Sequence, residues 1–133
     1  MFSRGLSTTV LTVVALTSMI AVTGCASAQD AKPVTKDFPF TGHTLNVRAH
    51  GAPTDLVASN RSDVLVTRWF DVRTGARPTT SWTLRDGTLD LSASCTGLAN
   101  CDVRFRVEIP ASVRVLRNGK PTKLHGAAPA TGK

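Results

Sequence analysis

Residues 103–109 read Val-Arg-Phe-Arg-Val-Glu-Ile, and this stretch decides the fold. Apolar side chains occupy every second position, and charged side chains occupy the positions between them. Because successive side chains of a strand point to opposite faces of a sheet, the alternation predicts a strand with one face in a core and the other in water. Pro110 follows and is expected to end the strand, since proline has no N–H to donate to a neighbouring strand.

The same period of two recurs from residue 45 onward, and no eleven-residue window there has the apolar spacing of a helix. Asp86-Gly87 and Asn118-Gly119 are dipeptides that favour two-residue hairpin turns. A loop is expected over 73–78, and Pro121 indicates an edge strand. The pattern predicts about seven or eight short strands and therefore an all-β fold, either a small antiparallel sandwich or a short β-solenoid-like domain. The apolar segments are 45–47, 56–57, 63–70, 82–91, 103–109 and 113–115.

The amino terminus has the layout of an export signal. Arg4 precedes a stretch without charged side chains, residues 5–29, whose centre is largely apolar. This layout predicts a helical signal peptide. A membrane-spanning helix needs about 20 predominantly apolar residues, and the threonines and serines of this stretch make a single-span anchor the second interpretation.

Val22-Thr23-Gly24-Cys25 resembles the lipobox of bacterial lipoproteins, which has a branched apolar residue, two small residues and a cysteine. The resemblance implies diacylglycerol on the sulfur of Cys25, cleavage between Gly24 and Cys25, and acylation of the new amino group, for example by palmitate. Two or more acyl chains give stable anchoring, which implies a position on the outer face of the bacterial cell membrane. The alternative is an ordinary signal peptide that is cut after Ala26-Ser27-Ala28 and removes Cys25.

The three cysteines are expected to have two different roles. With Cys25 assigned to the lipid, Cys95 and Cys101 remain as an even pair in an exported protein, where disulfides form and persist. We therefore predict a disulfide between them, and closing a loop of this length is worth about 2.4 kcal/mol in the chain-entropy model. A zinc site is a poorer interpretation, because the two cysteines would supply only two of the four ligands that zinc needs. A redox site is also a poorer interpretation, because redox-active cysteine pairs are more often spaced C-x-x-C.

The length and charge limit the organisation of the chain. It has 133 residues, with 16 Lys+Arg against 9 Asp+Glu and a net charge of +7. This length allows one domain and excludes a large multidomain enzyme. We expect a lipoprotein signal peptide over 1–24, a flexible tether over 25–37, a β domain over 38–124 and a disordered tail over 125–133.

The part of the chain from residue 82 to residue 115 combines an Asp-Gly hairpin, the cysteine pair, the 103–109 alternation and a further strand. Its characteristic residues are Trp82, Leu84, Asp86, Gly87, Leu89, Leu91, Cys95, Cys101, Val103, Phe105, Val107, Ile109, Pro110, Val113 and Val115. This arrangement resembles actinobacterial lipoproteins of the adhesin family. The resemblance implies an exported, solenoid-like β domain without assigned enzymatic activity. Because that family continues into further strand repeats after the proline, we expect this chain to be a shortened relative.

The sequence has no G-x-S-x-G elbow, phosphate-binding loop, H-E-x-x-H motif or dinucleotide fingerprint, and we expect no enzyme, no cofactor and no metal. His43 and His50 lie about 23 Å apart if the strand between them is extended, which is too far to share a metal ion. His125 falls in the expected tail. The alternative function is an envelope ligand-binding or hydrolytic lipoprotein whose site is not visible in the sequence.

Arg104 and Arg106 share one face of the predicted strand, and Arg114 is expected beside them on the next strand. One hypothesis is a basic patch that binds anionic lipid or an acidic wall polymer. The alternative is a solvated strand face on which the arginines pair with Glu108 or Asp90. No nucleic-acid partner is expected, because single-strand binding favours stacked aromatic side chains and the chain has only 2 Trp, 5 Phe and no Tyr.

Overall fold

The computed structural model describes residues 25–97 and 99–125. The signal peptide expected over 1–24, including the first three residues of the lipobox-like motif, lies outside the described residues. The same holds for residues 126–133 of the expected tail.

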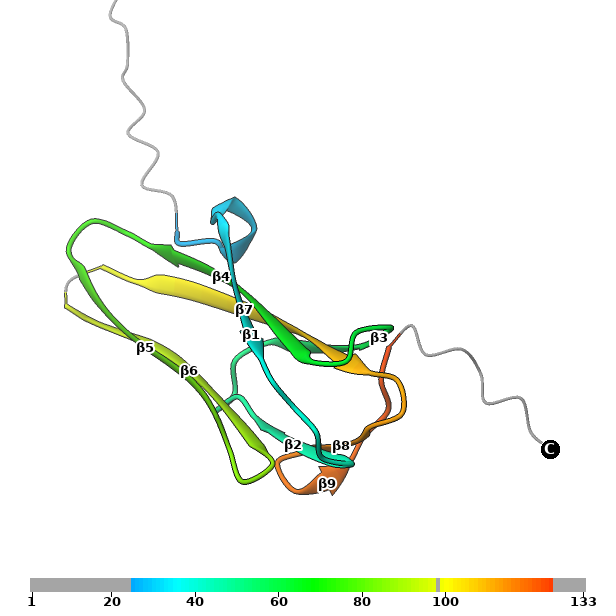
Figure 1. Cartoon of the computed structure of the whole chain (residues 1–133). Helices are drawn as coiled ribbons and strands as arrows, with labels where there is room; N and C mark the ends of the chain where they lie inside the picture. Colours follow the sequence, from blue (N-terminus) through cyan, green and yellow to red (C-terminus); the bar gives the residue numbers. More distant parts are fainter. Residues whose placement is uncertain (1–24, 98, 126–133) are drawn as a thin grey trace, which may run out of the picture.

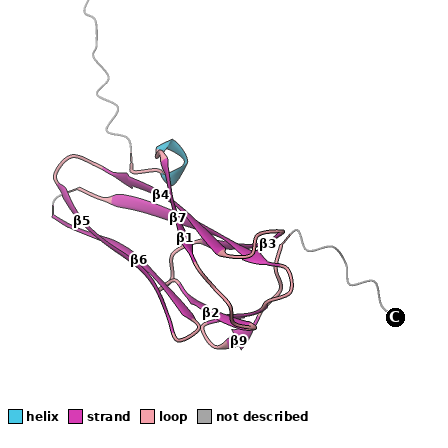
Figure 2. Cartoon of the chain, viewed as in Figure 1, coloured by secondary structure: helices cyan, strands magenta, loops and turns pink. Residues whose placement is uncertain are grey.

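The described part of the chain consists of one short 3-10 helix, η1, and nine strands (Figures 1 and 2). Their bounds are η1 Ala28–Asp30, β1 Pro33–Phe38, β2 Thr44–Arg48, β3 Thr54–Ser59, β4 Val64–Val72, β5 Ala76–Arg85, β6 Thr88–Gly97, β7 Cys101–Pro110, β8 Arg114–Arg117 and β9 Lys120–Pro121.

The strands form two mixed sheets. The four-stranded sheet has the order β1-β4-β7-β3, and the five-stranded sheet has the order β5-β6-β2-β8-β9. The prediction of an all-β fold is confirmed. Of the two predicted architectures, a purely antiparallel sandwich is not what the structure has, because β3 pairs with β7, and β2 with both β6 and β8, in parallel. The tight turns determine only the local hairpins, whereas parallel partners need long crossover connections that leave no short-range signal.

The chain crosses repeatedly between the two sheets. The connection from β2 to β3 and the connection from β6 to β7 both lead from the five-stranded to the four-stranded sheet. The strands joined by the second connection pair in parallel with the strands joined by the first, so that β6 lies beside β2 and β7 lies beside β3. A disulfide between Cys95 of β6 and Cys101 of β7 joins the two sheets at this connection, as predicted.

Side chains from both sheets share one apolar core. Phe105, Val107 and Ile109 are 0% exposed, which confirms the prediction from residues 103–109. They pack with residues of the five-stranded sheet such as Leu45 and Leu89, which are also fully buried. The charged residues between them on β7 therefore point to the outer face of the four-stranded sheet, the face turned away from the core.

Both predicted hairpin turns are present. Asp86 and Gly87 have φ values of 52° and 73° and connect β5 to β6, while Asn118 and Gly119 have φ values of 51° and 77° and connect β8 to β9. Two successive residues with positive φ form the turn whose twist matches that of the flanking strands. Pro121 lies on β9, the edge strand of the five-stranded sheet, as predicted.

The flexible tether expected over 25–37 is wrong, because residues 25–28 are hydrogen-bonded to the four-stranded sheet, residues 28–30 form η1, and residues 33–37 belong to a strand. Strand β1 occupies this segment and pairs antiparallel with β4, from Pro33 opposite Trp69 to Phe38 opposite Val64. All of its residues except Phe38 are exposed. An edge strand held by its backbone hydrogen bonds needs no apolar alternation, which is why the period of the sequence did not reveal it.

Two further expectations also differ from the structure. The loop expected over 73–78 ends early, because β5 begins at Ala76 and includes Pro78, which an edge strand tolerates. The expectation of a disordered tail is wrong at residue 125, because His125 forms a parallel bridge with Val57. The His125 N–H donates to the carbonyl of Leu56 at 2.8 Å, and its carbonyl accepts from the N–H of Ala58 at 2.9 Å.

Candidate functional site

The outer face of the four-stranded sheet brings two predicted arginines together over a tryptophan. Arg104 of β7 lies opposite Trp69 of β4, and Arg106 lies opposite Thr67. The guanidinium carbons of Arg104 and Arg106 lie 4.4 and 5.7 Å from the centroid of the Trp69 ring. Both distances allow cation–π attraction. We call Trp69, Arg104 and Arg106 the Trp69 patch.

The charges of the Trp69 patch are only weakly neutralised. Nε of Arg106 lies 3.9 Å from Oδ2 of Asp55, and both side chains are more than a third exposed, so this ion pair is weak. Among the described residues Arg104 makes no ion pair, and neither arginine pairs with Glu108 or Asp90. The pairs with Glu108 or Asp90 considered in the sequence are therefore not formed, but a weak cross-strand pair is, because Asp55 of β3 lies directly opposite Arg106.

Arg114 does not belong to this surface, and the expectation that it lies beside Arg104 and Arg106 is wrong. It is the first residue of β8, which belongs to the five-stranded sheet. The reason is that the chain crosses between the sheets after β7 instead of turning back in a hairpin. Arg114 is exposed and follows Val113, which packs on the core.

Two carboxylates on the same outer face hold the first described residues of the chain. Asp71 of β4 and Asp102 of β7 lie opposite each other. The N–H of Ser27 donates to Oδ2 of Asp71, and the N–H of Ala28 donates to Oδ2 of Asp102, each at 2.7 Å. The side chain of Ala28 is only 5% exposed, so this segment is packed as well as hydrogen-bonded.

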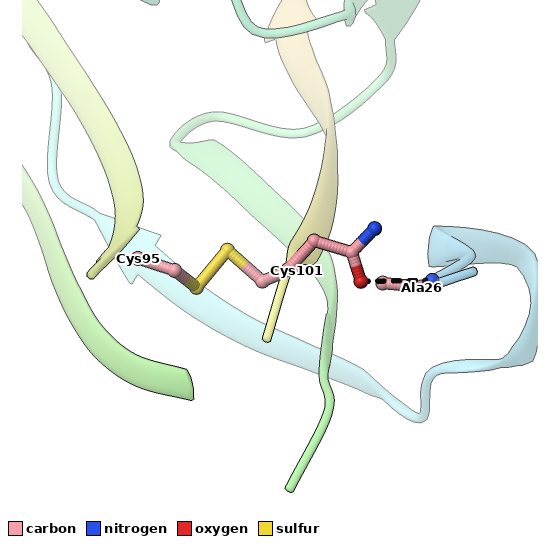
Figure 3. The surroundings of a disulfide bond; sticks show 4 residues. Ala26, Cys95 and Cys101 are labelled. Carbon is pink, nitrogen blue, oxygen red and sulfur yellow. Dashed lines mark hydrogen bonds between the residues drawn. A yellow bond between two sulfur atoms is a disulfide. The ribbon is translucent and has the colours of Figure 1, made fainter. Parts of the chain in front are cut away.

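Two further side chains contact the same segment. Nη2 of Arg73 donates to the carbonyl of Cys25 at 3.0 Å and lies 3.2 Å from Oδ2 of Asp71. Oδ1 of Asn100 accepts from the N–H of Ala26 at 3.4 Å, next to the disulfide (Figure 3). We call residues 25–28 the docked segment. None of its contacts was expected from the sequence, because they depend on the register of β4 against β7.

The cysteines divide as predicted among the described residues. Cys95 and Cys101 are paired, with their Cα atoms 6.1 Å apart (Figure 3). Cys25 is unpaired and exposed. The sulfur of Cys25 is thus accessible at the start of the docked segment.

A second group of cations lies on the inner side of the four-stranded sheet. The guanidinium carbon of Arg68 lies 4.4 Å from the centroid of the Trp82 ring, and Nζ of Lys36 donates to the Trp82 carbonyl at 3.5 Å. Nε of Arg68 is buried without a hydrogen-bond partner, and burial lowers the pKa of this arginine from its ordinary value. Trp82 packs against the core cluster, so this group closes the space between β4 and β5.

A shallow pocket of about 420 Å³ lies beside β6 in the five-stranded sheet. Nε2 of His50 lies 2.9 Å from Oδ1 of Asp90 at this pocket, and His50 has a φ of 50°. An imidazole beside a carboxylate can act as a general base. The pocket is lined by Ala49, His50, Ala52, Ser81, Asp90, Ser92, Ala93 and Ser94, and among the described residues no serine hydroxyl is hydrogen-bonded to His50.

Residues 25–97 and 99–125 contain no group of three or more His, Cys, Asp or Glu side chains placed to bind a metal ion. Within the same ranges, no helix has the length and apolar character needed to cross a bilayer.

In comparisons with known proteins, no protein-family model, no curated protein and no solved structure matches this chain. The fold and the surfaces described above define it as a two-sheet β domain with a docked amino-terminal segment and an outer face on which two arginines lie over Trp69 among carboxylates.

Proposed function

We propose that this protein is a lipoprotein of the bacterial cell envelope, anchored by diacylglycerol on Cys25 to the outer face of the cell membrane. The observation that carries the proposal is the lipobox-like motif that ends at Cys25. The distribution of the cysteines supports it, because Cys25 is exposed and unpaired while Cys95 and Cys101 are joined to each other. Two acyl chains suffice for stable anchoring.

The β domain acts, in this proposal, as a non-enzymatic binding module of adhesive or envelope-binding type. Its interior is filled by fully buried side chains such as Phe105 and Leu45, so a ligand would bind at the surface. The Trp69 patch is the candidate surface, since its two arginines lie beside a large aromatic ring and have only one weak ion pair among the described residues. Kinship with actinobacterial lipoproteins of the adhesin family is part of this proposal and is supported by the pattern of residues 82–115.

Substitution of the anchor cysteine tests the proposal. Cys25→Ser removes the thiol that accepts the lipid, and the protein is expected to move from the membrane fraction to the soluble fraction. The double variant Cys95→Ser/Cys101→Ser is the matched control, because it also replaces cysteine by serine but is expected to stay in the membrane fraction. Retention of Cys25→Ser in the membrane after washing with high salt would contradict the lipid anchor.

A second candidate function uses the pocket at His50 and Asp90. It is an envelope ligand-binding or hydrolytic activity, favoured by the imidazole–carboxylate pair at an open pocket of about 420 Å³. His50→Ala is expected to abolish such an activity, whereas His43→Ala, on an exposed residue that does not line this pocket, should leave it unchanged. Equal activity of both variants against ester, amide and glycoside substrates would eliminate this candidate.

A further inference from the structure

We propose that the docked segment orients the domain on the membrane, so that the outer face of the four-stranded sheet lies against the bilayer and the Trp69 patch contacts anionic lipid headgroups. This inference rests on the proposed function, because it requires the lipid on Cys25.

The first step is the fit between the docked segment and the two carboxylates. Asp71 and Asp102 lie directly opposite each other, and like charges in such cross-strand pairs repel. The N–H groups of Ser27 and Ala28 and the guanidinium of Arg73 supply the compensating charge and hydrogen bonds. Hydrogen bonds to ionised carboxylates are shorter and stronger than bonds between neutral groups. The strand ends therefore form a specific binding site for the backbone of this chain.

The second step is the short length of chain between the acylated sulfur of Cys25 and the β domain. With Ser27 and Ala28 bound, only Cys25 and Ala26 separate the acylated sulfur from the carboxylates, and two residues span at most about 7 Å. Even these two are contacted, at the carbonyl of Cys25 and the N–H of Ala26. A freely rotating tether would let any face of the domain meet the membrane, whereas this attachment selects one side.

The third step is the position of the Trp69 patch relative to the attachment. Along the outer face, the pair next to Asp71 and Asp102 is Trp69 and Arg104, two residues further along each strand, or about 7 Å. Arg106 follows at the next outward position of β7. The anchor thus brings a tryptophan and two arginines to the membrane surface on the face that carries the attachment.

The chemistry of the Trp69 patch suits lipid headgroups. Tryptophan is enriched at the boundary between hydrocarbon and water, where its ring and its N–H meet different surroundings. Arginine binds phosphate oxygens through paired N–H donors, and basic residues close to an anionic leaflet are attracted to it. Because the anchor makes the contact intramolecular, even a weak patch is occupied at a high effective concentration.

The attachment is tested by hydrogen exchange on the full lipidated protein, reconstituted in phosphatidylcholine vesicles with and without phosphatidylglycerol. The amides of Ser27 and Ala28 are expected to exchange at least about tenfold more slowly than in an unstructured peptide. Asp71→Ala/Asp102→Ala should remove this protection, and Asp71→Asn/Asp102→Asn should restore part of it because the amide oxygen still accepts. Glu108→Ala is the matched control, since it changes an acidic residue of β7 that does not contact the docked segment.

The orientation is tested by fluorescence quenching with brominated lipids, using single-tryptophan variants. Trp82→Phe leaves Trp69 as the only reporter, and its fluorescence should be quenched, more strongly with phosphatidylglycerol present. Trp69→Phe leaves Trp82, which lies between the sheets and should not be quenched. Arg104→Glu/Arg106→Glu and Asp71→Ala/Asp102→Ala should each reduce the quenching of Trp69 at least about twofold.

The outcomes separate the two proposals. Absence of diacylglycerol from Cys25 overturns the proposed function, and the membrane orientation with it. Lipidated protein whose Ser27 and Ala28 exchange freely, or whose Trp69 is quenched no more than Trp82, overturns the orientation alone. If purified anionic wall polymer binds the Trp69 patch while brominated lipid does not quench Trp69, the partner is the polymer and the lipid contact is wrong.

Discussion

At one end of the two-sheet domain, β2, β3, β8 and the part of β7 from Phe105 onward surround side chains that are completely buried, among them Leu45, Leu56 and Ile109. At the other end, where β6 leads into β7, the residues near Cys95 and Cys101 are half-buried or exposed. We call these the core end and the disulfide end. Figure 1 shows that η1 and the start of the described chain lie away from β2, β8 and β9, and toward the disulfide end.

The comparison teaches that the apolar core and the docking of residues 25–28 lie in different parts of this molecule. Hydrophobic burial is non-directional and requires no particular partner, and it holds the core end. The disulfide end depends on a covalent bond, on one ion pair and on hydrogen bonds to the docked segment. The predictions below test this separation, and they run from the largest expected effect to the smallest.

The largest effect is expected at the core end. Phe105→Ala removes the largest fully buried side chain and should lower the free energy of unfolding by about 3–5 kcal/mol. Val103→Ala, on the same face of β7 but only half-buried, is the matched control and should cost less than half as much. Both are measured by urea unfolding. An equal decrease in the free energy of unfolding for the two variants would show that apolar packing contributes as much to stability at the disulfide end as at the core end.

Removal of the disulfide should have the next largest effect. Cys95→Ser/Cys101→Ser should lower the free energy of unfolding by about 2.4 kcal/mol, because the reduced unfolded chain regains the freedom of the loop. The slope of the urea dependence should change little, since the core end stays intact. An unchanged unfolding midpoint would contradict the assignment of the disulfide as the main constraint at its end.

A glycine at the disulfide end provides a smaller and more local test. Gly97 has a φ of +108°, and a Cβ there would lie 2.5 Å from the carbonyl oxygen of Gly75. Gly97→Ala should therefore cost more than the roughly 1–2 kcal/mol of a positive φ alone. Gly119→Ala is the control, because Gly119 has a φ of +77° and an added Cβ would contact no other atom. Its loss of stability therefore measures the cost of the positive φ alone. Equal losses in the two variants, measured by thermal unfolding, would show that β5 and β6 separate easily near the disulfide.

The smallest effect is expected at the rim of the core end. The Arg61 side chain donates hydrogen bonds to Asp63 and lowers the pKa of that carboxyl below its usual value, mainly through this bond. A lowered pKa in the folded state contributes stability that is present above pH 4 and is lost as the pH falls through the lowered pKa. Arg61→Ala should raise the pKa of Asp63 toward its usual value in a carbon-detected NMR titration, with a minor change in stability. An unchanged pKa would show that the ion pair does not form.

The sequence predicts the features of this fold that depend on neighbours along the chain. The alternation of residues 103–109 and the two hairpin turns are local, and the structure has them as expected. Strand β1 was missed because its side chains are exposed, and the parallel pairs were missed because their partners are distant in the sequence. Periodicity describes which face a residue occupies, but not which strand lies beside it.

The candidate site shows the same limit. The shared face of Arg104 and Arg106 follows from the period of two, and the structure confirms it. Arg114 was misplaced and Trp69 was not associated with the arginines, because both relations depend on which strands pair. The period does place Trp69 on the face opposite to Val64 and Val66, together with Thr67 and Asp71, so a tryptophan on the polar face of the strand was the available signal.

The mass of the intact mature protein, purified from membranes and measured before and after reduction, tests the central claim most directly. The account predicts a chain that begins at Cys25 and carries diacylglycerol, with a gain of two hydrogens on reduction of Cys95–Cys101. A chain that begins at Gln29 without lipid would contradict both the anchor and the role of the docked segment.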